Sequence, residues 1–383
     1  MKNNIKNNKE DKQLVIESLE FSSLSQGMSI INKEKFIEVI SGILKVEALN
    51  SIKKEVTNLK DIVTKKAKDY RGILNIDSNG DTISLRRDVL TDELDQILES
   101  HTLERAIYYL KRLLESIQKV KTSKINDINL LRWKEYDDII TDSLWILGKR
   151  DTSGAHLGWY WGNFIPQIPH QMILRYTKKG ECVLDPFVGS GTTLIECRRL
   201  GRNGIGIELN PDVAQKAKEL IERETNKDNV VSEVFVGDSR TINIKSILEK
   251  FGIKQIQLLI MHPPYHDIIK FSKDKNDLSN AKDTEEFLRM FGEVVDTATP
   301  YLEKGRYFAL IIGDKYSKGE WIPLGFYCMQ EVLKRGYVLK SIIVKNFEET
   351  RGKRNQKELW RYRALVGGFY IFKHEYIMLF KKK

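Results

Sequence analysis

The chain has 383 residues, 41% of them hydrophobic and 30% charged, and its formal net charge is +10. This composition supports a buried core and a solvated surface, and the length predicts one large domain with an accessory region. The sequence shows no apolar run of membrane-spanning length and no signal-peptide pattern, so we expect a cytoplasmic protein. Its three cysteines, Cys182, Cys197 and Cys328, are too few and too scattered for a disulfide framework or a metal cluster, so we expect buried thiols and no metal.

The first part of the chain has a helical pattern. From about residue 12 to residue 124, Leu and Ile recur at spacings of three and four within charged stretches, as in LERAIYYLKRLL from Leu103 to Leu114. This stretch contains no proline, and Asn79-Gly80-Asp81 is its one strong turn signal. We therefore interpret residues 1–125 as an accessory helical region and residues 126–383 as the main domain.

After about residue 125, hydrophobic strands alternate with helices. Strands that alternate with helices of this length favour a mainly parallel, doubly wound α/β sheet. The closing segments, Lys340–Asn346 and Gly368–Phe380, have the pattern of an antiparallel pair at the sheet edge. The expected parallel strands are 182–184, 204–209, 234–236, 257–261 and 307–312, and the expected helices are 192–200, 211–223 and 284–302.

A glycine-rich turn follows the first of these strands and reads Asp-Pro-Phe-Val-Gly-Ser-Gly-Thr-Thr over residues 185–193. Gly189 and Gly191 allow a tight turn and the close approach of a ligand to the backbone. Thr192 and Thr193 open a helix whose N-terminal amides favour an anionic group. The turn lacks the third glycine of the dinucleotide fingerprint and the Lys-Ser/Thr of a P-loop, so neither of those sites is predicted.

Acidic residues end three successive strands, and these are Asp185, Glu208 and Asp238. Open α/β sheets bind ligands at the carboxyl ends of their strands, and a carboxylate at the end of the second strand commonly holds ribose hydroxyls. The carboxylates and the glycine turn therefore predict a single cofactor site.

A further strand ends in Met-His-Pro-Pro-Tyr at residues 261–265. Two prolines rigidly turn a carbonyl group outward and have no N–H group that could interfere. Together with the glycine turn, this corner resembles the catalytic and cofactor motifs of the S-adenosylmethionine-dependent DNA amino-methyltransferases, which methylate N6 of adenine or N4 of cytosine. The resemblance covers roughly residues 160–383.

The resemblance implies a Rossmann-like, seven-stranded, doubly wound sheet of the class I methyltransferases, with S-adenosyl-L-methionine as cofactor. In the family, the side chain before the prolines and the first proline carbonyl accept hydrogen bonds from the target amine, and the aromatic residue stacks on a base flipped out of the duplex. These roles fall on His262, Pro263 and Tyr265, with Pro264 completing the corner. The implied cofactor contacts are Asp185, Pro186, Phe187, Gly189, Ser190, Gly191, Thr192, Thr193, Glu208 and Asp238, the last of them at the adenine ring.

His262 departs from the family, which mostly carries Asp, Asn or Ser at this position. A neutral imidazole offers one acceptor nitrogen, whereas an imidazolium offers none. If His262 accepts the hydrogen bond, activity should collapse as the pH falls through its pKa, near about 6.5 for an unperturbed side chain. The alternative is a histidine behind the site, with backbone carbonyls alone holding the amine. This residue leaves the choice between adenine and cytosine open.

Positive charge is concentrated near the C-terminal end, where the last 44 residues contain twelve Lys/Arg and four Asp/Glu. Within them, residues 351–363 mix cations, amides and aromatic rings, the combination that phosphate contacts and base stacking require. A solvated connection between strands is the alternative, but beside a methyltransferase core we interpret the segment as a nucleic-acid-binding loop. Its candidate contacts are Arg351, Lys353, Arg354, Lys357, Arg361 and Arg363.

We expect a site-specific DNA methyltransferase of a restriction–modification system, a monomer or homodimer that binds double-stranded DNA and has a cognate restriction endonuclease. No gap between the motifs can hold a separate recognition domain, so recognition falls to the N-terminal helices, residues 271–279 and the basic segment. Dimerisation is the other role considered for the N-terminal helices. The alternatives are an RNA guanine-N2 methyltransferase, which also carries a Pro-Pro-Tyr corner, and a homologue that binds cofactor and nucleic acid without catalysis.

Overall fold

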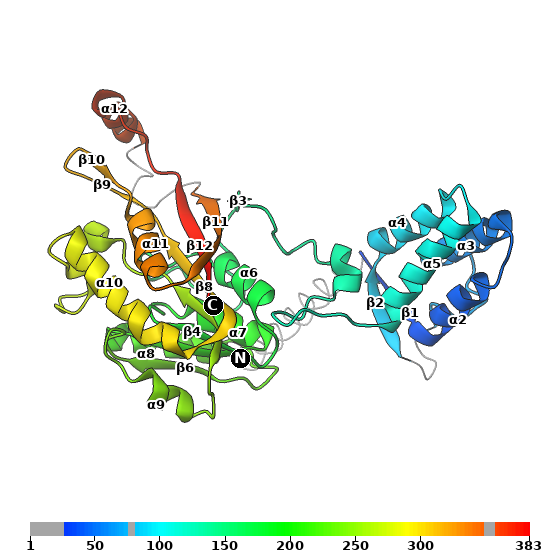
Figure 1. Cartoon of the computed structure of the whole chain (residues 1–383), viewed down its shortest axis with the longest axis horizontal. Coiled ribbons are helices and arrows are strands. Elements are labelled where there is room, and N and C mark those ends of the chain that lie inside the picture. Colours follow the sequence, from blue (N-terminus) through cyan, green and yellow to red (C-terminus); the bar gives the residue numbers. More distant parts are fainter. Residues whose placement is uncertain (1–26, 76–80, 348–356) are drawn as a thin grey trace, which may run out of the picture. The chain divides into compact units, whose positions relative to one another are not determined.

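A computed structural model covers the whole chain and describes residues 27–75, 81–347 and 357–383. The described residues divide into two compact units (Figure 1), one within residues 1–123 and 128–137 and the other within residues 124–127 and 138–383. Each unit has a hydrophobic core of its own. The three cysteines are free thiols, and all three are buried as expected. Within the described ranges, no helix has the length and apolar character needed to cross a membrane.

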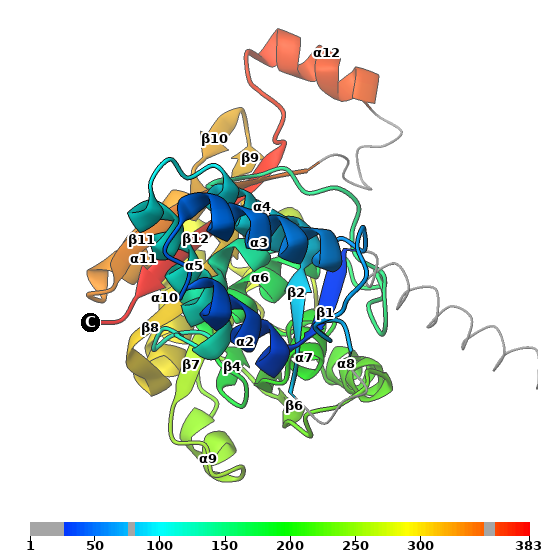
Figure 2. The same ribbon diagram turned by 90° about the vertical axis from the view of Figure 1, so that its right-hand side faces the viewer.

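Helices dominate the described part of the first unit, where α3 packs on α4 and α4 on α5 (Figure 2). The last of these helices begins after Thr102, whose side-chain oxygen accepts a hydrogen bond from the backbone N–H of Arg105 and satisfies a helix-end amide. Its buried side chains recur every three or four positions and so form one apolar face. The elements are β1 (Met28–Asn32), α2 (Lys33–Ile43), α3 (Leu49–Val63), β2 (Thr82–Arg86), α4 (Arg87–Leu98), α5 (Leu103–Gln118) and the 3₁₀ helix η1 (Leu130–Glu135).

Two segments of the first unit depart from the expected helical pattern. β1 pairs antiparallel with β2, with Met28 opposite Arg86 and Asn32 opposite Thr82. Each strand has only five residues, and its partner lies far away in the sequence, so no local pattern reveals the pairing.

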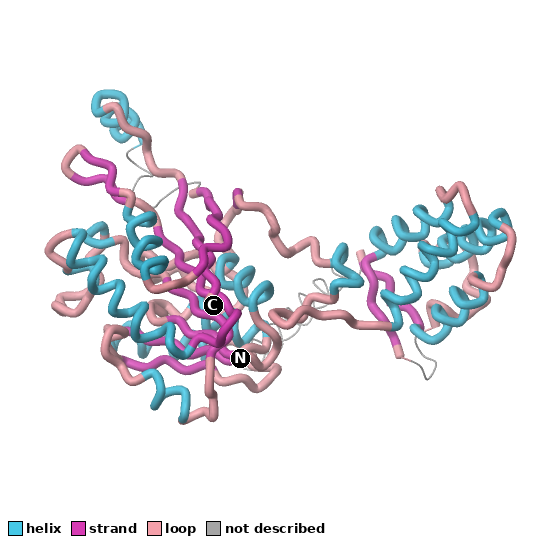
Figure 3. The backbone as a smooth tube through the Cα atoms, viewed as in Figure 1, coloured by secondary structure: helices cyan, strands magenta, loops and turns pink. Residues whose placement is uncertain are grey.

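Eight strands form one sheet in the described part of the second unit, in the order β3-β11-β12-β8-β7-β4-β5-β6. Figure 3 draws the strands in magenta. The strands from β6 across to β8 run parallel, and β12 is antiparallel to both β8 and β11. This order confirms the predicted doubly wound α/β fold. The bounds are β3 (Leu144–Trp145), β4 (Cys182–Asp185), β5 (Asn203–Glu208), β6 (Ser232–Val236), β7 (Ile256–Met261), β8 (Leu302–Ile312), β11 (Val338–Asn346) and β12 (His374–Lys381).

The eighth strand corrects the expected count of seven. β3 has two residues and pairs in parallel with Val344 and Lys345 of β11, at the edge of the sheet. Trp145 anchors it because its side chain is 1% exposed. A strand of two residues has no alternating pattern from which the sequence could predict it.

Helices cover both faces of this sheet. Along β7, Leu259 and Met261 belong to the core under α9, α10 and α11, whereas Leu258 and Ile260 belong to the core under α6 and α7. This alternation with a period of two is what a strand buried on both faces requires. The helices are α6 (Gln167–Tyr176), α7 (Thr192–Leu200), α8 (Pro211–Arg223), α9 (Ile244–Glu249), α10 (Thr284–Ala298) and α11 (Leu324–Lys334).

A hairpin, the helix α12 and three short 3₁₀ helices complete the described part of the second unit. The 3₁₀ helices are η2 (His266–Ile268), η3 (Leu278–Asn280) and η4 (Thr299–Tyr301). β9 (Lys315–Ser317) and β10 (Glu320–Ile322) form an antiparallel hairpin, and α12 spans Lys357–Gly367. The interpretation of the basic segment as a loop is therefore wrong from Lys357 onward, because Glu, Leu, Arg and Ala in this stretch are good helix formers. The preceding basic positions, Arg351, Lys353 and Arg354, lie outside the described residues.

Candidate active site

A cavity of about 740 Å³ lies at the carboxyl ends of the parallel strands. Its lining includes one residue or more from the end of each parallel strand. These are Pro186 after β4, Glu208 in β5, Asp238 after β6, His262 after β7 and Gly313 after β8. The glycine turn (residues 185–193) and the proline corner (residues 262–265) therefore share one cavity.

The glycine turn depends on backbone conformations that glycine adopts without strain. Gly189 and Gly191 have φ angles of +51° and +84°, in the left-handed region that favours glycine. A Cβ atom on Gly191 would lie 3.0 Å from Ile221 Cδ1, so a side chain there would force the Ile221 side chain of α8 to shift. Of the proposed cofactor contacts in the turn, those that line the cavity are Pro186, Phe187, Gly189, Ser190 and Thr192.

Asp185 is buried behind the cavity wall, with 1% of its surface exposed. Its Oδ1 accepts a hydrogen bond from the backbone N–H of Phe187 at 2.9 Å, and its Oδ2 accepts one from Thr193 Oγ1 at 2.5 Å. Burial raises the pKa of this carboxyl to about 7, although the two hydrogen bonds act in the opposite direction. We therefore propose that Asp185 supports the cofactor indirectly, by bracing both ends of the glycine turn.

Glu208 and Asp238 line the cavity in different electrostatic settings. Glu208 accepts hydrogen bonds from the backbone N–H groups of Gly189 and Asn210, both at 3.0 Å. Burial raises its pKa, against these backbone hydrogen bonds. Asp238 instead accepts hydrogen bonds from Arg240, from Nη2 at 2.7 Å and from the backbone N–H at 2.9 Å. Glu208 is thus tied to the glycine turn, whereas Asp238 has a cation beside it.

Residues 150–164 form another wall of the cavity that the sequence reasoning missed. Asn163 Nδ2 donates a hydrogen bond to Ser190 Oγ at 2.9 Å. The Tyr160 ring stacks on Phe271 with 5.6 Å between their centroids, and all four of these side chains line the cavity. Trp159 and Trp161 flank Tyr160 in the sequence, but this aromatic composition alone does not identify Tyr160 or Asn163 as cavity residues.

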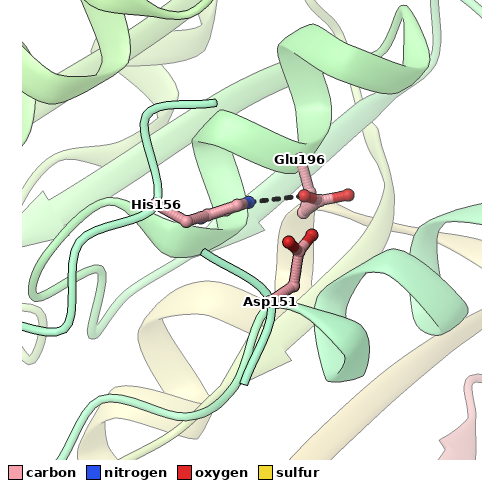
Figure 4. Close-up of side chains that lie close together, drawn as sticks. All are labelled: Asp151, His156 and Glu196. Carbon is pink, nitrogen blue, oxygen red and sulfur yellow. Dashed lines mark hydrogen bonds and ion pairs between the residues drawn. The ribbon is translucent and has the colours of Figure 1, made fainter. Parts of the chain in front are cut away.

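The same wall is anchored to α7 by Glu196 (Figure 4). This carboxylate accepts hydrogen bonds from His156 Nε2 at 2.6 Å and from His170 Nδ1 at 2.7 Å. Burial opposes its ionisation, but these bonds outweigh burial and lower the pKa of Glu196 to about 2. Asp151, His156 and Glu196 lie close enough together to hold a metal ion. Arg199 Nη1 already supplies the positive charge there, 3.1 Å from Glu196 Oε1 and 3.3 Å from Asp151 Oδ2, so we assign no metal to this cluster.

The proline corner lines the cavity with all four of its residues. His262 Nε2 lies 3.2 Å from Tyr265 Oη, and the His262 ring packs edge-on against Phe164 with 4.9 Å between centroids. Tyr265 Oη donates a hydrogen bond to Glu375 Oε2 at 2.7 Å, and Glu375 Oε1 lies 3.0 Å from Lys345 Nζ. Two buried charged residues thus stand behind the corner.

Lys345 and Glu375 are functional candidates that the sequence reasoning missed. Each is a charged residue inside an apolar strand, and this was the only local signal. Their pairing depends on the register of β11 against β12, where they lie directly opposite each other.

Burial of His262 changes the expected pH dependence. It lowers the pKa of His262 to about 4, with Glu375 opposing the shift and Lys345 adding to it. The collapse of activity near pH 6.5, which assumed an unperturbed side chain, is therefore not expected. Because the neutral acceptor form exists above this pKa, we predict that the single-turnover rate is flat from pH 5 to 8 and falls only as the pH approaches 4. A midpoint near pH 6.5 that disappears in His262→Asn would contradict the prediction.

The two described arginines of the basic segment, Arg361 and Arg363, are exposed on α12. The Arg363 guanidinium lies over the Trp360 ring, 5.3 Å from its centroid. Trp360 also lines the cavity, as does Phe372 beyond the end of α12. The helix therefore carries exposed cations close to the cavity.

The parallel sheet with its reversed β12 is the Rossmann-like fold of the class I methyltransferases, and the glycine turn and the proline corner lie in one cavity. The chain belongs to the DNA methylase family N6_N4_Mtase, whose model matches residues 6–219. This membership confirms the resemblance seen in the motifs. The matched range contains the glycine turn and ends before the proline corner.

Curated relatives also match parts of the chain. Type II methyltransferase M.MjaII of Methanocaldococcus jannaschii is 25% identical over 244 residues, which cover 57% of this chain and 44% of that protein. Type II methyltransferase M.HpaI of Haemophilus parainfluenzae is 44% identical over 63 residues, 16% of this chain and 20% of that protein. The tRNA (guanine(10)-N2)-dimethyltransferase of Pyrococcus abyssi is 32% identical over 113 residues, 30% of this chain and 32% of that protein. The chain thus matches less than half the length of each of these relatives.

Proposed function

We propose that this protein is a DNA methyltransferase that transfers a methyl group from S-adenosyl-L-methionine to an exocyclic amino group, N6 of adenine or N4 of cytosine, of a flipped base. The observation that carries the proposal is the shared cavity, which places the glycine turn and the proline corner around one space. Family membership and the names of the Type II relatives support DNA as the substrate.

The chemistry of the cavity fits S-adenosyl-L-methionine. We assign the ribose hydroxyls to Glu208, which lies at the end of β5 and lines the cavity. We assign the methionine carboxylate to the N-terminus of α7 at Thr192. Asp238 lies after β6, where we assign the adenine ring. When bound, the cofactor supplies a methyl group on a positively charged sulfur.

The proline corner supplies what a weak amine nucleophile needs. The lone pair of an exocyclic amine is delocalised into the base, so acceptors aimed at its N–H bonds favour a pyramidal nitrogen and stabilise its developing positive charge. We assign these acceptors to Nδ1 of His262 and the carbonyl oxygen of Pro263. The target nitrogen would then bond to the methyl carbon as the bond from that carbon to the cofactor sulfur breaks, and the methylated amine would lose one proton to solvent. The Tyr265 ring would support the flipped base during this step.

We propose residues 126–383 as the methyltransferase domain. Three segments are the candidates for target recognition, and the first is the accessory region of residues 1–125. Residues 271–279 contribute through Phe271 and Asp277, which line the cavity, and α12 contributes its arginines. The Type II relatives further support a role in restriction–modification alongside a cognate endonuclease.

Methyl transfer from tritiated S-adenosylmethionine tests this function against its alternatives. We expect label in duplex DNA and none in tRNA. Label confined to tRNA would instead support an RNA guanine-N2 methyltransferase, which the similarity to the Pyrococcus abyssi enzyme keeps as the second candidate. Cofactor binding without label in either substrate would support a homologue that has lost catalysis. Sequencing of methylated DNA from an expressing host then identifies the base and the site.

The arginines of α12 are expected to contribute salt-dependent affinity. Replacing Arg361 and Arg363 with alanine should weaken duplex binding and lower the slope of log affinity against log salt by roughly 0.9 for each phosphate that the variant no longer neutralises. Fluorescence anisotropy over a salt series measures both quantities. The matched control is Lys227→Ala with Lys245→Ala, which removes two exposed charges that do not line the cavity. Equal slopes for the two double variants would refute the assignment.

A further inference from the structure

A buried chain of polar contacts runs from the sheet to the proline corner. Lys345 Nζ lies 3.0 Å from Glu375 Oε1, and Tyr265 Oη donates a hydrogen bond to Glu375 Oε2 at 2.7 Å. At the far end, His262 Nε2 lies 3.2 Å from Tyr265 Oη. Lys345 and Glu375 are only 4% and 3% exposed. Removing two charges from water is costly unless further hydrogen bonds satisfy them, and here one of those bonds comes from the corner.

The direction of each hydrogen bond in this chain follows from its partners. An ammonium group can only donate, and an ionised carboxylate can only accept, so Lys345 and Tyr265 both donate to Glu375. The single hydroxyl proton of Tyr265 is then committed to Glu375, and the oxygen can only accept from His262. His262 must therefore carry its proton on Nε2. Its other nitrogen, Nδ1, keeps a lone pair and has no hydrogen-bond partner among the described residues.

We propose that Glu375, held by Lys345, is a positioning residue that sets the tautomer of His262 through Tyr265 and so presents Nδ1 as the acceptor for the target amine. This inference rests on the proposed function in one respect, which is that the group donating a hydrogen bond to Nδ1 is the target amine. It explains how a histidine can serve where the family carries Asp, Asn or Ser. A free histidine exchanges between tautomers, whereas this one is held in the form that accepts at Nδ1.

The Glu375→Gln variant should exchange the donor and acceptor roles in the hydrogen bonds between residue 375, Tyr265 and His262. Lys345 can only donate, so it will hold the amide oxygen and leave the amide N–H₂ group facing Tyr265. The Tyr265 oxygen then accepts from Gln, and its hydroxyl proton turns toward His262 Nε2. His262 must move its own proton to Nδ1, which can no longer accept a hydrogen bond.

Long-range nitrogen–hydrogen NMR correlation on the full-length protein with isotope-labelled histidine reads this tautomer directly. The signal of His262 is identified by its absence from His262→Asn among the six histidines. We expect the Nε2–H form in the wild type, the Nδ1–H form in Glu375→Gln, and a mixture in Tyr265→Phe. The kcat of Glu375→Gln should fall about 100-fold, as for loss of one group that stabilises transition-state charge, with cofactor affinity unchanged.

Tyr337→Phe is the matched control, because it removes a hydroxyl that hydrogen-bonds Thr299 and lies outside the cavity. It should leave both the His262 tautomer and kcat unchanged. An Nδ1–H form in the wild type, or an Nε2–H form retained in both Glu375→Gln and Tyr265→Phe, would overturn the proposal. The tautomer is measured without nucleic acid, so the test does not depend on methyl transfer. A wild-type protein that methylates no substrate would refute the proposed function, and the NMR measurement would still decide whether Glu375 sets the tautomer.

Discussion

Replacement of His262 with leucine is expected to lower kcat for methyl transfer at least about 100-fold, because it removes an acceptor that stabilises charge in the transition state. Leucine can still pack against Phe164, so the wall of the cavity should remain filled. The glycine turn follows a different strand, β4, so we expect cofactor affinity to stay close to that of the wild type. Single-turnover transfer of tritiated methyl groups, with calorimetric titration of S-adenosylhomocysteine, separates the two effects.

His262→Asn is the control for this replacement. Asparagine keeps a side-chain acceptor, and the family also carries it at this position, so this variant should retain more activity than His262→Leu. A leucine variant that transfers methyl groups at the wild-type rate would show that backbone carbonyls alone hold the amine. His262 would then act only as a packing residue behind the site.

The fold of the second unit could be largely predicted because its signals are local. The helices Thr192–Leu200 and Pro211–Arg223 have the bounds expected from the sequence. The second of them begins with proline after Asn210, whose side chain accepts a hydrogen bond from Asp212 N. β3 and the pairing of β1 with β2 could not be predicted, because they depend on contacts between segments distant in the sequence.

The candidate site divides in the same way. Glu208 and His262 could be predicted from motifs because each lies at the carboxyl end of a parallel strand, and that position alone brings them to the cavity. Tyr160 and Glu375 reach the same cavity from distant segments, and only the packed structure shows it. The lowered pKa of His262 could not be predicted from the sequence either, because it arises from burial in the folded protein.

Asp185→Ala is expected to weaken cofactor binding by about 100-fold, although Asp185 does not line the cavity. The substitution leaves the Phe187 N–H and the Thr193 hydroxyl without their acceptor. A buried polar group that loses its hydrogen-bond partner costs about 1–3 kcal/mol. Two such groups would therefore destabilise the binding conformation of the glycine turn by about 2–6 kcal/mol. The cofactor must then reorder the turn as it binds. Calorimetric titration with S-adenosylhomocysteine measures the loss, and thermal unfolding reports the accompanying destabilisation.

The Asp185→Asn variant distinguishes two roles for Asp185, which are hydrogen bonding to the glycine turn and a direct effect of its negative charge on the cofactor. Its amide keeps one acceptor oxygen for either Phe187 or Thr193, so the affinity loss should be smaller than in the alanine variant. If Asp185 acted through its negative charge on the cofactor, both variants would lose affinity equally. If both bound S-adenosylhomocysteine as tightly as the wild type, the buried carboxyl would have no part in forming the site, and the glycine turn would hold its shape through Glu208 and its own glycines.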